Sequence, residues 1–373
     1  MAYDSLQIAI AGTEAADIYP DLLSLEVELD EELAGMFRLT LALQLHADGS
    51  WSYLDDDRLV PWQPVVITAG LASDTEQLLS GYITHLRPCF TDGLDQCQLE
   101  IWGMDASVLM DRDDVLRDWP NKKDSDIAQE VFQSYRLTPQ VTDTGVIHDE
   151  AVSTIIQRET DIRFLRRLAL RNGYECFVDG ATGYFQPPAV DGSPQPVLAV
   201  QFGDQTTVTR FALEVNALAP SNVTMFQVDR LNKQVLDASA DSLALRQLGA
   251  KPISSFLAGD MTPGQVYLGQ AVTTGLPEMT VLCQELYDRS NWFVTGEGEV
   301  DANGYGNVLK PRGIVLIKGV GETHSGMYYL SHVTHSFTAD GYTQRFTVKR
   351  NALAPTGSEN FAVGTGLLPG SPV

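Results

Sequence analysis

The sequence has no apolar run close to the roughly 18 residues that a membrane-spanning helix requires. Its first residues, MAYDSLQIAIAG, lack the basic region that precedes the apolar core of a signal peptide. We therefore expect a protein that is made in the cytoplasm as a soluble chain and does not insert into a membrane.

Basic residues are scarce. The chain has 25 lysines and arginines against 49 aspartates and glutamates, which gives a formal net charge of −24. Such a surface repels the phosphate backbone of DNA or RNA, so the composition argues against nucleic-acid binding.

Cysteine is also rare, with four residues in 373: Cys89, Cys97, Cys176 and Cys283. They form no C-x-x-C pair and have no histidine cluster nearby, so we expect free, buried thiols in a reducing compartment. Cys89 and Cys97 could face each other across a hairpin, although nothing in the sequence requires a disulfide.

Catalytic and cofactor motifs are absent as well. No nucleophile elbow, zinc-protease, P-loop or dinucleotide-binding pattern stands in its required context. His332 and His335 share one expected strand, but their odd spacing points them to opposite faces, so they cannot jointly bind a metal. We expect no cofactor, no metal site and no catalytic residue.

Two acidic clusters keep an enzymatic alternative open. The run Asp55, Asp56, Asp57 and the set Glu297, Glu299, Asp301 could supply the paired carboxylates of a cell-wall glycosidase. A chain this acidic is expected to contain such pairs by chance. Peptidoglycan turnover that is lost in Glu297→Gln or Asp56→Asn would support the glycosidase.

One further segment has a weak resemblance to a calcium-binding loop. It runs from Asp301 through Asn303 to Gly306, but Tyr305 stands where an oxygen ligand belongs and no glutamate closes the loop. We favour a glycine-rich connection between strands.

What the sequence does contain is mostly strand pattern. In the first 115 or so residues, apolar positions alternate with polar ones at Leu23, Leu25, Val27, Leu29 and at Phe37, Leu39, Leu41, Leu43, Leu45. Leu6–Ile10, Val65–Leu71, Leu78–Leu86 and Cys97–Ile101 continue the pattern. Several short strands without intervening helices predict an antiparallel barrel or sandwich.

A mixed segment follows. Asp113–Asp126 reads as a charged connector, and a helix then begins near Ile127, capped from Asp124, Ser125 or Asp126. A second helix is predicted between Thr160 as N-cap and Gly173 as C-terminal stop, and Tyr174–Phe185 should form a hairpin around Asp179–Gly183.

The second helix is strongly basic, with Arg163, Arg166, Arg167 and Arg171. These side chains either form a solvated helix face or pair with acidic residues of another subunit.

Strands are expected to resume at Leu198–Phe202, Phe211–Val215 and Val223–Asp229, with helices at Ser239–Leu248 and Pro277–Tyr287. A second strand block runs from Trp292 to Asn351, where Asp340-Gly341 gives the strongest hairpin signal of the chain. The segment Ala354–Val373 is rich in Gly, Pro and Ser, as in a flexible or docked tail.

Two motifs resemble a known family. TIIQRETDIRFLRRLALRNGYECFVDGATGYFQPP, residues Thr154–Pro188, resembles a pattern of the phage late control D family, Q-x-x-E-[ST]-D-x-x-F-L-x-R-L-A-x-x-x-G-Y followed by a hairpin. The matching positions are Gln157, Glu159, Thr160, Asp161, Phe164, Leu165, Arg167, Leu168, Ala169, Gly173 and Tyr174. GYTQRFTVKRNAL, residues Gly341–Leu353, is similar to the closing strand of that family.

The family consists of baseplate hub proteins of contractile tails, similar to the N-terminal hub part of type VI secretion spike proteins. The resemblance implies a structural homotrimer with two related tube-like barrels per chain, which adapts a six-fold inner tube to a three-fold spike and transmits contraction force. The implied partners are a spike protein, a tube or tube-initiator protein and other baseplate components in a virion-like particle. We find no hexapeptide-like repeats, so we expect the spike to be a separate polypeptide.

The predicted architecture is therefore mainly β with an α+β insert, in a ring-forming trimer. We expect a first tube-like antiparallel β-barrel at 1–115, an α+β insertion at 116–197, strands returning to the barrel region at 198–235, a second barrel with helices at 236–353 and a flexible or spike-docking tail at 354–373.

This non-enzymatic hub has two alternatives, namely the glycosidase and a carbohydrate- or receptor-binding tail domain, which glycan binding by the isolated protein would favour. As a hypothesis, part of the negative charge lines a lumen and keeps DNA or cargo from adhering to the wall.

Overall fold

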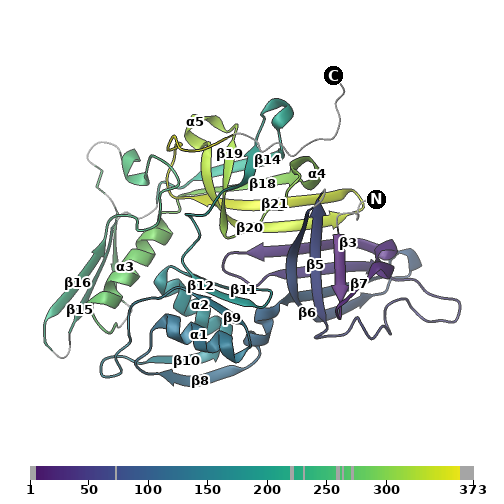
Figure 1. Ribbon diagram of the computed structural model, residues 1–373, viewed down its shortest axis with the longest axis horizontal. Coiled ribbons are helices and arrows are strands. Elements are labelled where there is room, and N and C mark those ends of the chain that lie inside the picture. Colours follow the sequence, from purple (N-terminus) through teal and green to yellow (C-terminus); the bar gives the residue numbers. More distant parts are fainter. Residues whose placement is uncertain are drawn as a thin grey trace.

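The computed structural model describes residues 6–71, 74–218, 222–229, 232–257, 261–262, 264–269 and 273–361. It confirms a mainly β chain built on one large sheet, with an α+β segment below it and a smaller helix-backed sheet to one side (Figure 1). All four cysteines are free; Cys97, Cys176 and Cys283 are buried, as predicted, but Cys89 is only partly buried.

The large sheet has 13 strands, and all but one of its pairings are antiparallel. Its main path, in spatial order, is β14 (Val208–Val215), β18 (Val294–Asp301), β21 (Gly341–Arg350), β20 (Gly326–Thr338), β3 (Leu22–Asp30), β4 (Met36–Ala42), β7 (Gln98–Asp105), β6 (Asp74–Cys89), β5 (Pro64–Leu71), β1 (Leu6–Ile10) and β2 (Thr13–Glu14). Off this path, β19 (Gly313–Lys318) pairs with β20, and β13 (Gln195–Ala199) pairs with β19 in parallel.

Strand β20 connects the two strand blocks of the sequence. Its first residues, 326–330, pair with β19, and its later residues, 332–338, pair with β3. The register shifts between Leu330 and His332, where the strand changes partner. The two predicted blocks are therefore one continuous sheet.

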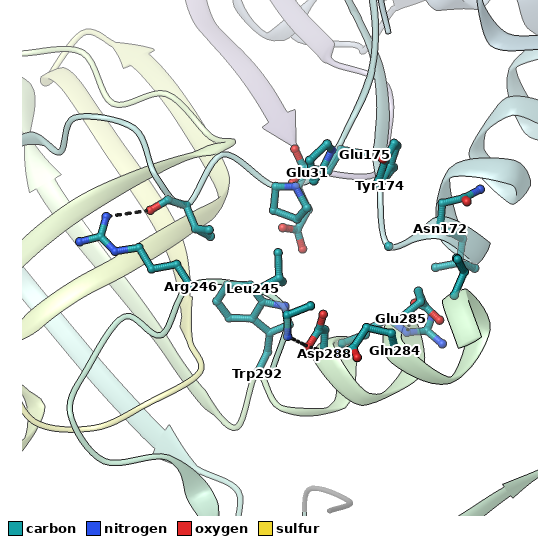
Figure 2. Close-up of a pocket in the computed structure, with 18 of the residues that line it drawn as sticks. Glu31, Asn172, Tyr174, Glu175, Leu245, Arg246, Gln284, Glu285, Asp288 and Trp292 are labelled. Carbon is teal, nitrogen blue, oxygen red and sulfur yellow. Dashed lines mark hydrogen bonds and ion pairs between the residues drawn. The ribbon is translucent and has the colours of Figure 1, made fainter. Parts of the chain in front are cut away.

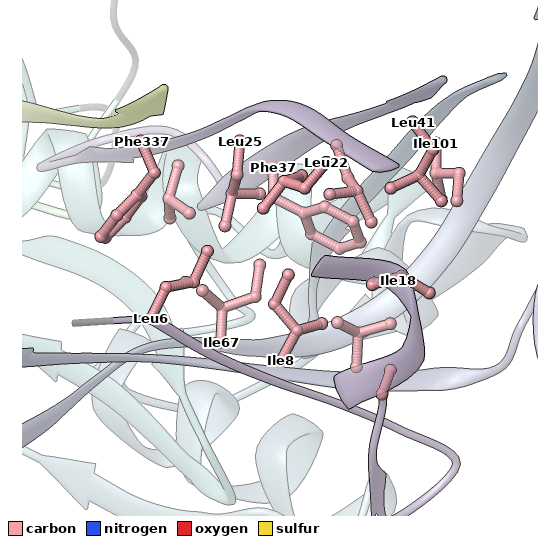
Figure 3. Packing of buried hydrophobic residues seen from close by; sticks show 14 of the residues in the cluster. Leu6, Ile8, Ile18, Leu22, Leu25, Phe37, Leu41, Ile67, Ile101 and Phe337 are labelled. Carbon is pink, nitrogen blue, oxygen red and sulfur yellow. The ribbon is translucent and has the colours of Figure 1, made fainter. Parts of the chain in front are cut away.

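The first block encloses an apolar core between β1 and β5 on one side and β3, β4 and β7 on the other (Figure 3). Leu25, Val27, Phe37, Leu39 and Leu41 are buried, as their alternation predicts. The alternation fails at both ends. Leu23 is exposed because the β3–β4 register shifts beside it, and Leu45 is exposed beyond the end of β4.

The hairpin predicted at Asp340-Gly341 exists, displaced by one residue. Thr338 pairs with Gly341, so Ala339 and Asp340 form the two-residue turn. Next to it, the rings of Phe337 and Tyr342 stack with centroids 4.1 Å apart. Both rings belong to the first core, so the tip of a second-block hairpin completes the packing of the first block.

The second block has its own core. Strands β18 to β21 with β13 and β14 surround Leu198, Val208, Phe293, Val294, Val300, Val315, Ile317, Tyr328, Leu330, Phe346 and Val348. An isolated bridge between Val200 and Val208 brings the end of β13 to the start of β14.

The insertion is an α+β unit with a core of its own. Its elements are η3 (Ala106–Asp111), β8 (Asp114–Trp119), α1 (Asp124–Ser134), β9 (Thr138–Val141), β10 (Ile155–Thr160), α2 (Asp161–Asn172), β11 (Glu175–Asp179) and β12 (Thr182–Gln186). The hairpin of β11 and β12 is confirmed, and β9 adds to it in parallel. Helix α2 ends at Gly173, whose φ of 67° is the predicted left-handed stop.

Two details of the insertion differ from the sequence prediction. The supposed connector Asp113–Asp126 contains β8, which pairs with β10 and buries Trp119 while the charged Asp114 and Asp118 stay exposed. Thr160 does precede α2, but its hydroxyl donates to Asp111 instead of capping the helix.

A third unit lies beside the insertion. β15 (Asn222–Val228), β16 (Val235–Ala240) and β17 (Gln265–Leu268) form a separate sheet, and α3 (Leu276–Ser290) packs on one face of it. Helix α3 was predicted, but the helix expected at Ser239–Leu248 is wrong. That segment contains the end of β16 and then turns, because side chains elsewhere bind its backbone. The Asp288 carboxylate accepts a hydrogen bond from the amide of Ala244, and the Asn351 side-chain oxygen accepts one from the amide of Leu248.

The remaining elements are short: η1 (Ala16–Asp21), η2 (Leu94–Gln96), η4 (Gly203–Gln205), η5 (Ile253–Phe256), α4 (Ala302–Tyr305) and α5 (Gly321–His324). Of the predicted tail, residues 354–361 are described, and Phe361 packs on the second block. Residues 362–373 lie outside the described part of the chain.

The motif that begins at Gln157 forms a buried hydrogen-bond network. Gln157 is fully buried, and its Oε1 accepts from Trp119 Nε1 at 3.2 Å. Its Nε2 donates to Asp161 Oδ1 at 2.7 Å, and Asp161 also accepts from the Tyr135 hydroxyl at 2.8 Å. The motif therefore fastens α2 to β8, β10 and α1.

The closing motif fixes the loops around the second block. Arg350 is fully buried and donates to the carbonyls of Leu248, His324, Ser325 and Ala354. Asn351 accepts the amide of Leu248 and donates to the carbonyl of Arg246. Both motifs thus have structural roles in the described residues.

We predict that Gln157→Ala lowers the free energy of unfolding by about 2 kcal/mol, because it leaves the buried Trp119 N–H and the Asp161 carboxylate each short of a partner. Denaturant unfolding measures this. Arg158→Ala, on the exposed face of the same strand, is the matched control and should change stability by less than about 0.5 kcal/mol. Equal effects of the two changes would contradict the network.

Candidate functional site

The two acidic clusters have structural partners. Arg58 contacts Asp56 and Asp17, each at 2.6 Å, and its hydrogen bonds lower the pKa of both carboxyls. Asp301 accepts the amide of Gly304 at 2.9 Å and so caps α4. Glu299 lies on β18 opposite Arg345 of β21. Among the described residues, no hydrogen bond or ion pair joins Asp55, Asp56 or Asp57 to Glu297, Glu299 or Asp301.

The supposed calcium loop is the end of β18 followed by α4. Gly306 closes the short helix with a φ of 70°, and Tyr305 is buried with its hydroxyl donating to the carbonyl of Pro196 at 2.7 Å. A core tyrosine therefore occupies the position of an oxygen ligand, in agreement with a connection between strands.

The two neighbouring histidines point to opposite faces, as predicted. His335 is fully buried beside the Tyr342 hydroxyl at 2.8 Å, and burial lowers its pKa to about 3. His332 lies on the other face with Nδ1 3.0 Å from Asp30, and this hydrogen bond raises its pKa. Within the described ranges, no group of three or more His, Cys, Asp or Glu side chains could hold a metal ion.

The arginines of α2 are mostly engaged within the chain. Arg163 pairs with Asp111 at 2.9 Å, and Arg167 pairs with Glu159 at 2.7 Å. Arg171 contacts Glu278 of α3 and lies 3.6 Å from Asp124. Arg166 is different, because two of its buried nitrogens have no hydrogen-bond partner among the described residues. The helix thus offers little free positive charge to another subunit.

The outer face of the large sheet carries charge of both signs. We name it the charged sheet face and define it by Glu26, Glu28, Arg38, Arg210, Glu297, Glu299 and Arg345. Opposite charges approach one another across strands, as in the 3.6 Å contact of Arg345 with Glu26. A hollow of about 370 Å³ on this face is lined by Glu28, Glu297, Glu299, His332 and Arg345, among others. The opposite face of these strands covers the apolar cores.

A second hollow lies where the large sheet, the insertion and the third unit meet. We name it the junction pocket; it has a volume of about 500 Å³ (Figure 2). Glu31 and Glu175 lie on one wall, and Glu285, Asp288 and Trp292 lie on the facing wall. Helix α3 is joined to the insertion by close polar contacts among Asp124, His148, Arg171 and Glu278.

Glu175 is the most buried carboxylate of this pocket. The Tyr329 hydroxyl donates to its Oε1, while its Oε2 has no hydrogen-bond partner among the described residues. Burial raises the pKa of Glu175 to about 7, with a further contribution from the nearby charge of Glu31. Burial also raises the pKa of Glu285 to about 7. The sequence analysis missed these acids, because they come from distant segments and no local spacing connects them.

The pocket makes folding stability depend on pH. The folded-state pKa of Glu175 lies near 7, above the ordinary value of 4.5, so its protonated form stabilises the fold fully below pH 4.5 and this contribution disappears as the pH rises through 7. The charged groups that face it are Glu31, Arg312 and Lys349, and the neutral Tyr329 hydroxyl lies against it.

The parent should lose up to about 3 kcal/mol of unfolding free energy through Glu175 as the pH rises to neutral. We predict that Glu175→Gln removes this loss, so that the variant gains stability over the parent near neutral pH. Denaturant unfolding at a series of pH values measures the difference. Glu297→Gln, on the exposed face of β18, is the control and should follow the parent. A Glu175→Gln profile parallel to that of the parent would show that this carboxyl titrates normally.

Known structures share this fold. The 43 kDa tail protein of prophage MuSo2 from Shewanella oneidensis is 14% identical, with a TM-score of 0.64 over 94% of this chain and 99% of that one. A tail protein from Neisseria meningitidis is 12% identical, with a TM-score of 0.62 over 93% of this chain and 96% of that one. The E. coli c3393 protein, a type VI secretion component described as similar to T4 tail proteins gp27 and gp5, is 13% identical, with a TM-score of 0.51 over 94% of this chain and 79% of that one.

The chain therefore has the fold of phage tail proteins along nearly its whole length. No helix in the described part of the chain is long and apolar enough to cross a membrane. Among curated proteins, none matches the sequence. A protein family described as the Alg8 N-terminal domain matches residues 2–339. The chain belongs to the Alg8 N-terminal domain family, and it has a tail-protein fold.

Proposed function

We propose that this chain is the structural hub of a phage-tail or contractile-injection baseplate. In this proposal three copies form a ring that adapts a six-fold inner tube to a three-fold spike and transmits the force of contraction. The observation that carries it is the continuous sheet with two separate apolar cores, in a fold shared with tail proteins over 94% of the chain.

Two cores on one sheet support a pair of tube-like units per chain. The first core lies under β1 to β7, and the second lies within β13, β14 and β18 to β21. In the second unit, the Val200–Val208 bridge brings the two ends of the strand set together, which favours a barrel. Three copies with two such units each would present six units to a six-fold tube.

The boundaries that we propose for these units are those of the sequence: 1–115 and 236–353 for the tube-like units, 116–197 for the insertion and 198–235 for the returning strands. The separate core formed by β15, β16 and α3 supports a further subdivision within the segments 198–235 and 236–353. Residues 354–373 are proposed to reach the spike.

The partners in this proposal are two further copies, a spike protein, a tube or tube-initiator protein and other baseplate components. Particle assembly follows synthesis in the cytoplasm. This choice of partners is supported by the fold that the chain shares with the E. coli type VI secretion protein, which is described as structurally similar to T4 tail proteins.

We further propose that the chain has no enzymatic activity and that the charged sheet face lines the lumen. The engagement of Asp56 by Arg58 and of Asp301 by the α4 amide supports the first point. Cross-strand pairs of opposite charge support the second, because a face of mixed sign holds neither a polyanion nor a polycation strongly.

The test is solution mass by light scattering, alone and with the candidate spike and tube proteins of the same assembly. We expect a species near three times the 40.8 kDa of one chain, formed or tightened when the spike protein is added. A glycan-binding or peptidoglycan-cleavage assay on the same sample tests the two alternatives.

A stable monomer that ignores both partners would contradict the hub. If the chain cleaves peptidoglycan and Glu297→Gln abolishes this activity, the glycosidase assignment would replace the hub. Gln157→Ala serves as a folding control, because it weakens the fold without changing the charged sheet face. A loss of the trimer in this variant would show the effect of misfolding alone.

A further inference from the structure

We propose that the junction pocket is a docking site for a basic side chain, lysine or arginine, presented by a partner protein. The proposal rests on the pocket alone and does not depend on the hub assignment. Its volume of about 500 Å³ lies in the range of pockets that hold ligands.

The charge balance of the lining is the first argument. Six of the lining residues are acidic and three are basic. Two of the basic residues are already paired, because Arg289 lies 3.0 Å from Glu285 and Lys349 lies 2.6 Å from Glu31. The third, Arg246, reaches Asp191 only at 4.0 Å. The lining therefore keeps an excess of negative charge after its own ion pairs are made.

The second argument is the unused oxygen of Glu175. This residue is 6% exposed, and its Oε2 lacks a hydrogen-bond partner among the described residues. A buried carboxylate oxygen without a donor is costly, and a charged donor relieves that cost more than a neutral one. Because this oxygen itself has almost no accessible surface, an ammonium or guanidinium group in the pocket would stabilise the Glu175 carboxylate by charge attraction.

The third argument is that the pocket already holds a cation of its own chain in this manner. The Nζ atom of Lys349 lies 4.8 Å from the ring centre of Trp292 and 5.4 Å from that of Tyr329, beside the carboxylate of Glu31. Aromatic faces next to a carboxylate attract lysine and arginine. A metal ion fits less well, because no group of three or more potential ligands is assembled within the described ranges.

The apolar part of the pocket lining favours a peptide over a free small cation. Leu170, Leu245, Val281 and Pro187 also line the pocket, and Leu170 is 43% exposed. Apolar residues on either side of the basic residue would cover these apolar side chains. A lining that combines an excess of acidic groups with apolar side chains thus suits a basic residue that has apolar neighbours.

Binding should be linked to proton release. Glu175 and Glu285 each have a pKa of about 7, raised by burial, and the pKa values of Glu31 and Asp288 are also raised by burial. The cations that face them are Lys349, Arg312 and Arg289. A bound cation favours the ionised carboxylates, so affinity should rise as the pH increases through 7.

Calorimetric titration of the full-length chain tests the proposal. The probes are the peptide acetyl-Gly-Leu-Arg-Leu-Gly-amide, the same peptide with neutral citrulline in place of arginine, and spermidine. We expect binding of the arginine peptide only, about tenfold weaker in Glu175→Gln and weaker at about pH 5.5 than at about pH 8.

Two variants separate the pocket from general attraction to an acidic protein. Glu285→Gln changes the facing wall and should also weaken binding. Glu297→Gln removes the same charge from the charged sheet face and should leave binding unchanged. Equal affinity for the citrulline peptide, equal or tighter binding of spermidine, or an equal loss in Glu297→Gln would overturn the proposal. No binding by the folded parent would overturn it as well.

Discussion

The pairing of β20 with β3 is the interaction on which the rest of the structure depends. Because β20 is paired along its first part with β19 and along its second part with β3, hydrogen bonds run without a break from one strand block to the other. The stacked rings of Phe337 and Tyr342 extend this coupling into the first core. A force that acts on one block is therefore transmitted through a sheet and not through a flexible linker.

Three arginines with little or no exposure reinforce the boundaries between the parts. Arg312 donates to the carbonyl of Asp30 in the first block and lies 3.8 Å from the ring centre of Phe177 in the insertion. Arg171 joins the insertion to α3, and Arg350 joins the loops around the second block. Removing a charge from water costs free energy unless the charge keeps its partners. A displacement of any of these arginines would leave it without them, so each favours one arrangement of its surroundings.

Much of the fold could be predicted from local pattern. Alternation identified the strands that contain Leu25, Val27 and Phe37, and helix spacing with a glycine stop identified α2. Predictions failed where long-range contacts decide the local structure. Side chains of Asp288 and Asn351 bind the segment that was expected to be a helix, and β8 is a strand only because β10 pairs with it. The junction pocket is a stronger case, because Glu31, Glu175 and Glu285 meet only in the folded chain.

Native-state hydrogen exchange of the backbone amides tests the central claim most directly, since it compares the stability of β3 and β20 with that of both cores. If the two blocks behave as one rigid unit, the amides of β3 and of residues 332–338 exchange only by global unfolding. Their free energy of opening then equals that of the amides in the core strands β7 and β21. Much faster exchange along β3 and the second part of β20, with both cores still protected, would show two independent blocks and contradict the account.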